Sequence, residues 1–514
     1  MRATAARLRG RRPPARRRGI GAAAVVLALG SGLPASPAPR QGSSPSRVQV
    51  VVELGRRAGA AVTSLASTTW NVGDLSAIDP WRPPVVRVTA RLDRIAPGPG
   101  QLRLDDLQQR LGTVRRMGAE PQLILAPMPT WLGRSRAASC RLPPGPPAAC
   151  SPSAMAPSRP AAFAALVQRV ATAAATGPGR VRRFEAWNEP DLPRFWSDTP
   201  QRFTDLAVQV HLAVRAAARS TGLPLVVGGP ALSRPGPLVR AYVDATTRAG
   251  VPPAFLSWHT YTKDPAELVS DASAVRAQAG PAGARLPLVL DEWSLKGRRN
   301  PGHEDNVGAA FALAGLIEME QAGLAQANWY RSVSYPKATS DPGTVFGDGR
   351  RKPVWWVLST WAASRGNRLV TTGSSQENGR WVRAVRDGDV VNVFLARYRD
   401  GPAAKDVEQI ALRLDGPCAA RSLQVRTIAS AGDSWASGRA RALTSPVPLP
   451  DDSAVWVRAD CSPSTPLTDR PLVVALAVAT VAAVLVALVV RGSRRMRRRL
   501  RAGGFSASGT GSGS

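Results

Sequence analysis

The sequence of 514 residues predicts a (β/α)8 barrel followed by an antiparallel β-module. From about residue 60 to residue 364, short apolar runs alternate with amphipathic stretches, as expected for strands that each feed a crossover helix. After residue 365 the pattern changes to an alternation of apolar and polar residues, which is typical of antiparallel strands. A doubly wound open sheet is the alternative for the first part, but it usually has fewer units and a Gly-rich phosphate loop, which the sequence lacks.

The barrel is expected within residues 43–364 and has eight strands, each followed by a helix. The expected strands are a first one near Ala61–Ser67, then Pro84–Thr89, Gln122–Pro127, Arg183–Asn188, Leu225–Gly229, Ala254–His259, Leu286–Asp291 and Gln326–Tyr330. The expected helices are Leu104–Met117, Ala161–Ala175, Arg202–Ser220, Leu238–Ala249, Pro265–Ala279 and Asp305–Ala322, with Pro353–Ala363 as the closing helix.

The β-module is expected at residues 365–462 as a β-sandwich with hairpin turns at Asp387-Gly388 and Asp400-Gly401. Val48–Leu54, with the sequence VQVVVEL, precedes the barrel and can pair with this module instead of joining the barrel. Residues 463–470 are rich in Pro and Ser, which suggests a short stalk.

The net charge of +32 first suggests nucleic acid, but its distribution argues against such a partner. Fifteen arginines lie in residues 1–18 and 491–502, which contain no acidic residue, and +17 remains for the rest. The first cluster precedes the apolar run IGAAAVVLAL and a small, Pro-rich segment, so residues 1–42 are expected to be a secretory signal and linker.

The second arginine cluster follows Leu472–Val490, an uncharged apolar run that at about 1.5 Å per residue matches the hydrocarbon thickness of a bilayer. We therefore expect a single transmembrane helix at residues 471–490 and a basic, Gly/Ser-rich cytoplasmic tail at 491–514. The catalytic part would then lie outside the cell, anchored to the cell membrane by its C-terminal helix.

The four cysteines fit an exported domain with two disulfides. Cys140 and Cys150 lie in one Pro-rich loop, and Cys418 and Cys461 flank the end of the β-module, so proximity favours these two pairs. A metal site is the alternative, but neither pair has CxxC spacing or a neighbouring His.

Two carboxylates stand where barrel strands end, on the rim where barrel enzymes build their sites. Glu189 follows the fourth strand in FEAWNEP, and Glu292 ends the seventh in LVLDEWS. The 103 positions from Glu189 to Glu292 are filled by three βα units, which places the two residues across the barrel mouth from each other. Two facing carboxylates without metal ligands suit glycoside hydrolysis, in which one acts as acid and the other stays ionised.

The motifs FEAWNEPDLPRFW, SWHTY and LDEWS resemble those of the fourth, sixth and seventh strands of glycoside hydrolase family 39. That family of β-xylosidases and α-L-iduronidases belongs to a large clan of retaining enzymes, and the resemblance covers roughly residues 60–460. It implies that Glu189 is the acid/base, that Glu292 is the nucleophile, and that Asn188 hydrogen-bonds the sugar 2-hydroxyl.

The same resemblance implies that His259 and Tyr261 line the site near Glu292. It also implies that Arg87, in VVRVTA, supports the nucleophile. The family usually has His two residues after this Arg, and this chain has Thr89 there.

Other residues of these segments have competing explanations. Glu185 lies deeper in the fourth strand and is better explained by an internal ion pair with Arg. Among the Trp residues near strand ends, Trp329 is expected to form a platform for a sugar ring. The three histidines are too scattered for a metal site, and no cofactor is expected. The loop at residues 133–160 extends from the third strand on the catalytic face and could wall the cleft.

The sequence thus predicts a retaining glycoside hydrolase that acts on a xyloside, uronoside or arabinoside-like linkage through a covalent glycosyl-enzyme. Carbohydrate and membrane are the expected partners, without nucleic acid. Two alternatives use the same barrel: a transglycosylase with the same carboxylate pair, and a protein that binds cell-envelope glycans without cutting them.

Overall fold

The computed structural model describes residues 47–134 and 151–462, with internal gaps at 298, 400–405, 421, 433 and 436–437, together with Arg491. Every statement about the structure below concerns these residues. The expected signal segment, the stalk, the expected transmembrane helix and the pair Cys140–Cys150 lie outside them. In the part of the chain that is described, no helix has the length and apolar character needed to cross a membrane.

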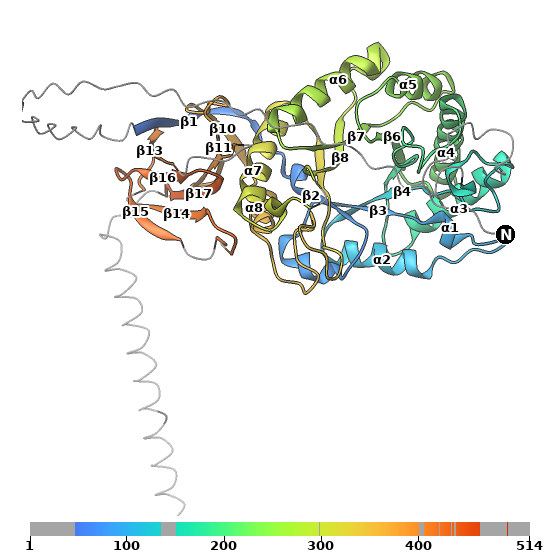
Figure 1. Cartoon of the computed structure of the whole chain (residues 1–514), viewed down its shortest axis with the longest axis horizontal. Coiled ribbons are helices and arrows are strands. Elements are labelled where there is room, and N and C mark those ends of the chain that lie inside the picture. The colour runs from blue at the N-terminus through green and yellow to red at the C-terminus, as the bar shows by residue number, and fades with distance from the viewer. Residues whose placement is uncertain are drawn as a thin grey trace, which may run out of the picture. The chain divides into compact units, whose positions relative to one another are not determined.

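Eight parallel strands close into a barrel in which each strand pairs with the next and the last pairs with the first (Figure 1). The barrel strands are β2 (Ser67–Trp70), β3 (Val85–Thr89), β4 (Glu120–Ile124), β5 (Arg183–Glu185), β6 (Val226–Leu232), β7 (Leu256–Thr262), β8 (Leu288–Leu295) and β9 (Gln326–Trp329). The expected (β/α)8 barrel is therefore present, and the fourth and seventh barrel strands are β5 and β8.

Helices surround the barrel, and their apolar faces pack against the strands in one continuous core. The α-helices are α1 (Leu92–Ile95), α2 (Asp105–Arg116), α3 (Pro160–Thr176), α4 (Pro200–Thr221), α5 (Leu238–Arg248), α6 (Pro265–Gly283), α7 (Asn306–Gln321) and α8 (Pro353–Ala363). Short 3-10 helices are η1 (Thr63–Ala66), η2 (Leu75–Trp81), η3 (Pro152–Ala154) and η4 (Pro301–His303). The seven helices expected from the sequence correspond to α2 through α8.

The first barrel strand begins later than the sequence suggested. Residues Thr63–Ala66 form the 3-10 turn η1, and only Ser67–Trp70 pairs with the neighbouring strands. Just before this turn, the Val62 amide donates a hydrogen bond to Glu320 Oε1 on α7, at 2.9 Å. Apolar periodicity alone does not distinguish such a turn from the start of a strand.

The β-module is a nine-stranded sheet in the order β15-β14-β17-β12-β11-β10-β1-β13-β16. Its strands are β1 (Arg47–Ala60), β10 (Asn367–Thr371), β11 (Arg380–Asp387), β12 (Val390–Arg397), β13 (Val407–Asp415), β14 (Ser422–Ile428), β15 (Arg439–Ala442), β16 (Val447–Pro450) and β17 (Ser453–Asp460). Apolar side chains from both ends of the sheet meet in one core, as in a sandwich.

Two expectations for this module are confirmed. Strand β1 lies in its sheet and not in the barrel, because Arg47–Glu53 pairs with β13 in parallel and the strand continues antiparallel to β10. Cys418 and Cys461 form a disulfide that joins the segment before β14 to the end of β17.

Helix α7 joins the barrel to the module and is buried on all sides from Gly308 to Glu320. Two carboxylates on this helix are buried and find partners on β11. Trp381 Nε1 donates to Glu318 Oε1 at 2.6 Å, and the Arg383 guanidinium donates to both oxygens of Glu320 at 2.7 and 2.9 Å. A buried acidic group is tolerated only with such partners, so these contacts fix the sheet on the barrel.

Candidate active site

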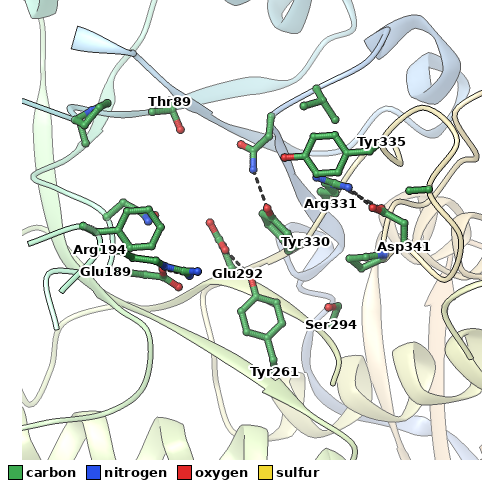
Figure 2. A pocket seen from close by; sticks show the side chains of 18 of the residues that line it. Thr89, Glu189, Arg194, Tyr261, Glu292, Ser294, Tyr330, Arg331, Tyr335 and Asp341 are labelled. Carbon is green, nitrogen blue, oxygen red and sulfur yellow. Dashed lines mark hydrogen bonds and ion pairs between the residues drawn. The ribbon is translucent and has the colours of Figure 1, made fainter. Parts of the chain in front are cut away.

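The carboxyl ends of the barrel strands surround a pocket of about 1590 Å³ (Figure 2). Asn188, Glu189, Tyr261 and Glu292 line it, so the structure brings together residues that the sequence placed on three different strands. Arg87 and His259 are fully buried and contact these residues from within the barrel.

Glu189 stands in the turn after β5, with its backbone in the left-handed region at a φ of 45°. A non-glycine residue pays for this conformation in local strain, and such strain often marks a position where a side chain is aimed for function. The turn is held by a hydrogen bond from the Glu189 amide to the carbonyl of Ala231, at 2.8 Å. The side chain is buried to 7 % relative exposure and points into the pocket.

Glu292 reaches the pocket because strand β8 contains a bulge. In the ladder with β7, Trp258 pairs with Leu290 and His259 pairs with Glu292, so Asp291 is an extra residue. Consecutive side chains of a regular strand point to opposite faces, whereas a bulge re-aims one of them. Asp291 and Glu292 consequently both turn toward the same guanidinium.

That guanidinium belongs to Arg87 on β3, which bridges the two sides of the barrel. Its Nε donates to Glu185 Oε2 at 2.5 Å, its Nη1 to Glu292 Oε1 at 2.6 Å, and its Nη2 to Asn188 Oδ1 at 3.0 Å. Asp291 Oδ2 lies 3.3 Å from Nη2. Burial alone would lower the pKa of Arg87, but the surrounding carboxylates outweigh burial and raise it.

Glu185 and Asp291 lie beneath the pocket and differ in protonation. Burial would raise the pKa of Glu185, but Arg87 and several hydrogen bonds outweigh burial and lower that pKa to about 2. Burial and the charge of Glu185 raise the pKa of Asp291 well above its ordinary value. Of these two buried carboxyl groups, Asp291 therefore holds a proton more readily than Glu185. The internal ion pair expected for Glu185 is present.

Donor groups contact both oxygens of Glu292. Oε1 accepts from Arg87, and Oε2 accepts from the Tyr261 hydroxyl at 2.5 Å (Figure 2). Burial and the nearby charge of Glu292 raise the pKa of Tyr261 well above its ordinary value, so its hydroxyl keeps the proton that it donates. These donors fix the orientation of the Glu292 carboxyl group.

Glu189 also has a partner on each oxygen. Its Oε1 lies 3.0 Å from His259 Nδ1, and its Oε2 accepts from Arg194 Nη2 at 3.1 Å. Burial alone would raise the pKa of Glu189, but these two partners outweigh burial and lower it.

His259 is shared between the two carboxylates of the pocket. Its Nδ1 lies 3.6 Å from Glu292 Oε2. One ring nitrogen of His259 and one carboxylate oxygen from each of Glu189 and Glu292 all lie within 4.8 Å of one another. The two carboxylates of the pocket therefore face each other at close range.

The expectation for Trp329 is not met. Its indole is buried at 1 % relative exposure, donates to the carbonyl of Pro342 at 2.8 Å, and packs against Trp293 with ring centroids 4.9 Å apart. The side chain lies among the aromatic rings of the helix layer, away from the pocket. The next residue, Tyr330, lines the pocket instead.

Sequence reasoning missed Arg194 and Tyr330. Tyr330 lies edge-on to Tyr261, with ring centroids 5.9 Å apart, and its hydroxyl accepts from Asn71 at 3.2 Å. Arg194 belongs to the same motif as Glu189, so its place in DLPRFW was the available signal. Nothing in the sequence shows that this arginine turns back onto the carboxylate five residues before it.

Comparisons with known proteins match one segment of the chain to an enzyme family. Residues 166–335, which include both pocket carboxylates, match the model of Glycosyl hydrolases family 39. No curated protein matches the chain.

The fold resembles solved structures at low sequence identity. A monomeric beta-xylosidase from Caulobacter crescentus is 18 % identical with a TM-score of 0.65. The match covers 81 % of this chain and 100 % of that one. A GH39 enzyme from Xanthomonas axonopodis pv. citri is 18 % identical with a TM-score of 0.66, over 82 % of this chain and 99 % of that one.

A glucosidase from Croceicoccus marinus is 17 % identical with a TM-score of 0.63, over 81 % of this chain and 99 % of that one. The resemblance to family 39 inferred from the motifs is thus confirmed for the segment that carries Glu189 and Glu292. The chain is a glycosidase whose barrel resembles that of glycosyl hydrolases family 39.

Proposed function

We propose that the chain is a retaining glycoside hydrolase in which Glu189 is the acid/base and Glu292 the nucleophile. The observation that carries this proposal is the approach of the two carboxylates, which bring oxygens within 4.8 Å of each other. Retaining glycosidases have carboxyl groups about 5–5.5 Å apart, whereas inverting ones need about 6.5–9.5 Å to hold a water molecule.

In the first step, a carboxylate oxygen of Glu292 bonds to the anomeric carbon while the bond from that carbon to the leaving oxygen breaks. Glu189 transfers its proton to the leaving oxygen, so no alkoxide is released. Arg87 and Tyr261 hold the Glu292 carboxyl group oriented before the attack. The sugar is then an ester of Glu292.

In the second step, the ionised Glu189 removes a proton from a water molecule whose oxygen bonds to the same anomeric carbon. The ester bond to Glu292 breaks, and the carboxylate returns to its contacts with Arg87 and Tyr261. Two successive inversions at one carbon give a product with the anomeric configuration of the substrate.

We propose a pentosyl, uronosyl or arabinosyl-like linkage of an oligosaccharide or polysaccharide as the substrate. Tyr330 supports a sugar as the ligand, because an aromatic ring beside the two carboxylates can stack on the apolar face of a sugar ring. Asn188 is proposed to bind the 2-hydroxyl, since Arg87 fixes its side-chain oxygen and so orients its amide nitrogen.

The test is a panel of aryl glycosides assayed with the purified full chain and with Glu189→Gln and Glu292→Gln. We expect turnover of at least one glycoside and a loss of about 10³-fold or more in the Glu292→Gln protein. Glu120→Gln is the matched control, because Glu120 is exposed at the start of β4, at the opposite end of the barrel. Full activity of Glu292→Gln would contradict the assignment.

We further propose that the catalytic part acts outside the cell and is held at the membrane by residues 471–490. This proposal rests on the sequence alone: a basic segment and short apolar run precede the barrel, and an uncharged apolar run is followed by arginines. Cell fractionation and protease treatment of intact cells test it. Activity in the membrane fraction that external protease removes is expected, and activity in the cytosol would contradict it.

A further inference from the structure

Arg194 donates to one oxygen of Glu189, and His259 Nδ1 lies 3.0 Å from the other. The leaving oxygen must receive a proton from Glu189, and the Arg194 guanidinium opposes that protonation because it helps to lower the pKa of Glu189. His259 is fixed, because its side chain is fully buried on β7. Arg194 lies in the turn after β5, its side chain is 57 % exposed, and it is the partner that can move.

Arg194 is placed to reach a ligand in the pocket. Its guanidinium lies 4.5 Å from the centroid of the Phe195 ring, and both residues line the pocket beside Glu189 (Figure 2). Because Glu189 is the proposed proton donor to the leaving group, a guanidinium on its outer oxygen faces the leaving-group side of the substrate.

The rest of the pocket wall is strongly basic. Apart from Arg194, its cations are Arg91, Arg94, Arg110, Arg299, Arg331 and Lys337. The only acidic residue among the lining residues besides the catalytic pair is Asp341, which is already paired with Arg331. Within the described ranges, only Arg91 and Arg331 of these six form ion pairs. Such a wall attracts an anionic ligand.

We propose that Arg194 is a specificity-determining residue that binds an acidic substituent of the glycan on the leaving-group side and thereby leaves Glu189. The substituent is a carboxylate, a sulfate or a phosphate ester, each of which a guanidinium binds through paired hydrogen bonds. This inference rests on the proposed function and adds to it that the substrate is anionic.

The exchange has a consequence for the proton on Glu189. The groups that face its carboxylate are Arg194 from the turn, His259 and Tyr261 from β7, and Glu292 from β8. Arg194 contributes to lowering the pKa of Glu189, and burial opposes it. When Arg194 pairs with a substrate anion, burial remains and the pKa rises, so an anionic substrate promotes protonation of its own general acid.

The experiment compares two aryl glycosides of the same sugar, whose phenol leaving groups are equally acidic but differ in carrying a sulfonate. The proteins are the wild-type full chain, Arg194→Met, which keeps a chain to pack on Phe195, and Arg194→Lys. Arg219→Met is the control, because Arg219 is exposed in the last turn of α4.

We expect the wild type and the control to prefer the sulfonated glycoside in kcat/KM by about tenfold, a preference that Arg194→Met loses and Arg194→Lys keeps in part. On the neutral glycoside, the basic limb of the pH profile should move to higher pH in Arg194→Met, a shift that a merely structural role would not produce. An unchanged preference in Arg194→Met would overturn the inference.

Binding of inorganic sulfate, followed by calorimetry, provides a readout that does not depend on turnover. Wild-type protein should bind sulfate about tenfold more tightly than Arg194→Met, and equal binding would overturn the role of Arg194. If the wild type binds sulfate through Arg194 but cleaves no glycoside, the proposed function fails and the anion site remains. If it cleaves the neutral glycoside but residue 194 affects neither readout, only this inference fails.

Discussion

Asp291 and Glu292 are neighbours in the chain, and yet their carboxyl groups turn to the same side of strand β8. The bulge opposite His259 produces this arrangement. The Arg87 guanidinium contacts both groups, with Nη2 3.3 Å from Asp291 Oδ2 and Nη1 2.6 Å from Glu292 Oε1. The carboxyl group of Asp291 lies beneath the site with a raised pKa, whereas that of Glu292 stands at the pocket with a donor on each oxygen. The local ladder of two strands therefore decides which of two adjacent acids can serve as a nucleophile.

Asp291→Asn should fold at least as well as the wild type at pH 7. Asn is always neutral and has nearly the shape of the protonated acid that the fold requires. The pKa of Asp291 is raised in the folded protein, so its contribution to stability is complete below the unfolded pKa of 3.8 and is lost as the pH rises. Relative to Asp291→Asn, the wild-type melting temperature should therefore fall as the pH rises above about 4. If the melting temperature of the wild type instead rises relative to that of Asp291→Asn over this range, the raised pKa of Asp291 is contradicted.

Glu185→Gln should behave in the opposite way, because Glu185 is the ionised partner of Arg87. Removing its charge leaves a buried guanidinium short of compensation, at a cost of about 3–5 kcal/mol near neutral pH. The pKa of Glu185 is lowered from 4.5 to about 2, so its contribution is present above pH 4.5 and disappears as the pH falls through about 2. Melting curves of the two proteins should converge over that window. If the difference in melting temperature between the two proteins stays constant over this pH range, the charge of Glu185 is not what stabilises the wild type.

Tyr261→Phe should lower kcat/KM by about 10²-fold without unfolding the protein, because Glu292 loses the donor on Oε2. Kinetics on the best aryl glycoside, with a melting curve beside them, measure both effects. Tyr242→Phe is the matched control. Tyr242 is also buried, but its hydroxyl contacts His211 at 2.8 Å, away from the pocket, so this change should reduce stability and spare activity. Equal losses of activity in both variants would remove the special role of Tyr261.

Arg383→Met should destabilise the protein by about 3–5 kcal/mol, because it leaves Glu320 buried on α7 without its bidentate partner. The double variant with Glu320→Gln should recover part of that loss. Arg458→Met, at an exposed position of the same sheet, is the control and should change stability by less than about 0.5 kcal/mol. If the two single variants melt alike, the contact does not hold the module on the barrel.

The sequence predicted the barrel because each strand is a short apolar run between amphipathic helices, and the two carboxylates because they end the fourth and seventh runs. It did not predict the bulge at Asp291, since one extra residue in a ladder leaves no mark in hydropathy. The error at Trp329 has a similar origin. Trp329 and Tyr330 are adjacent aromatic residues, and only the direction of the strand decides which of them faces the pocket.

Arg194 illustrates a different limit. Its distance from Glu189 depends on the turn between the two residues, in which Glu189 itself has a left-handed backbone. Such a turn is fixed by contacts with β6, notably the Ala231 carbonyl, which are remote in sequence. Local patterns consequently identify the residues of this site more readily than the pairings among them.

The central claim is double displacement through Glu292, and the anomeric configuration of the first product tests it most directly. The purified full chain is given the aryl glycoside that it cleaves best, and the released sugar is followed by proton NMR before its anomers equilibrate. The account predicts that the sugar first appears with the configuration of the substrate. A first product of opposite configuration would contradict the account, because a single displacement by water inverts the anomeric carbon and forms no bond to Glu292.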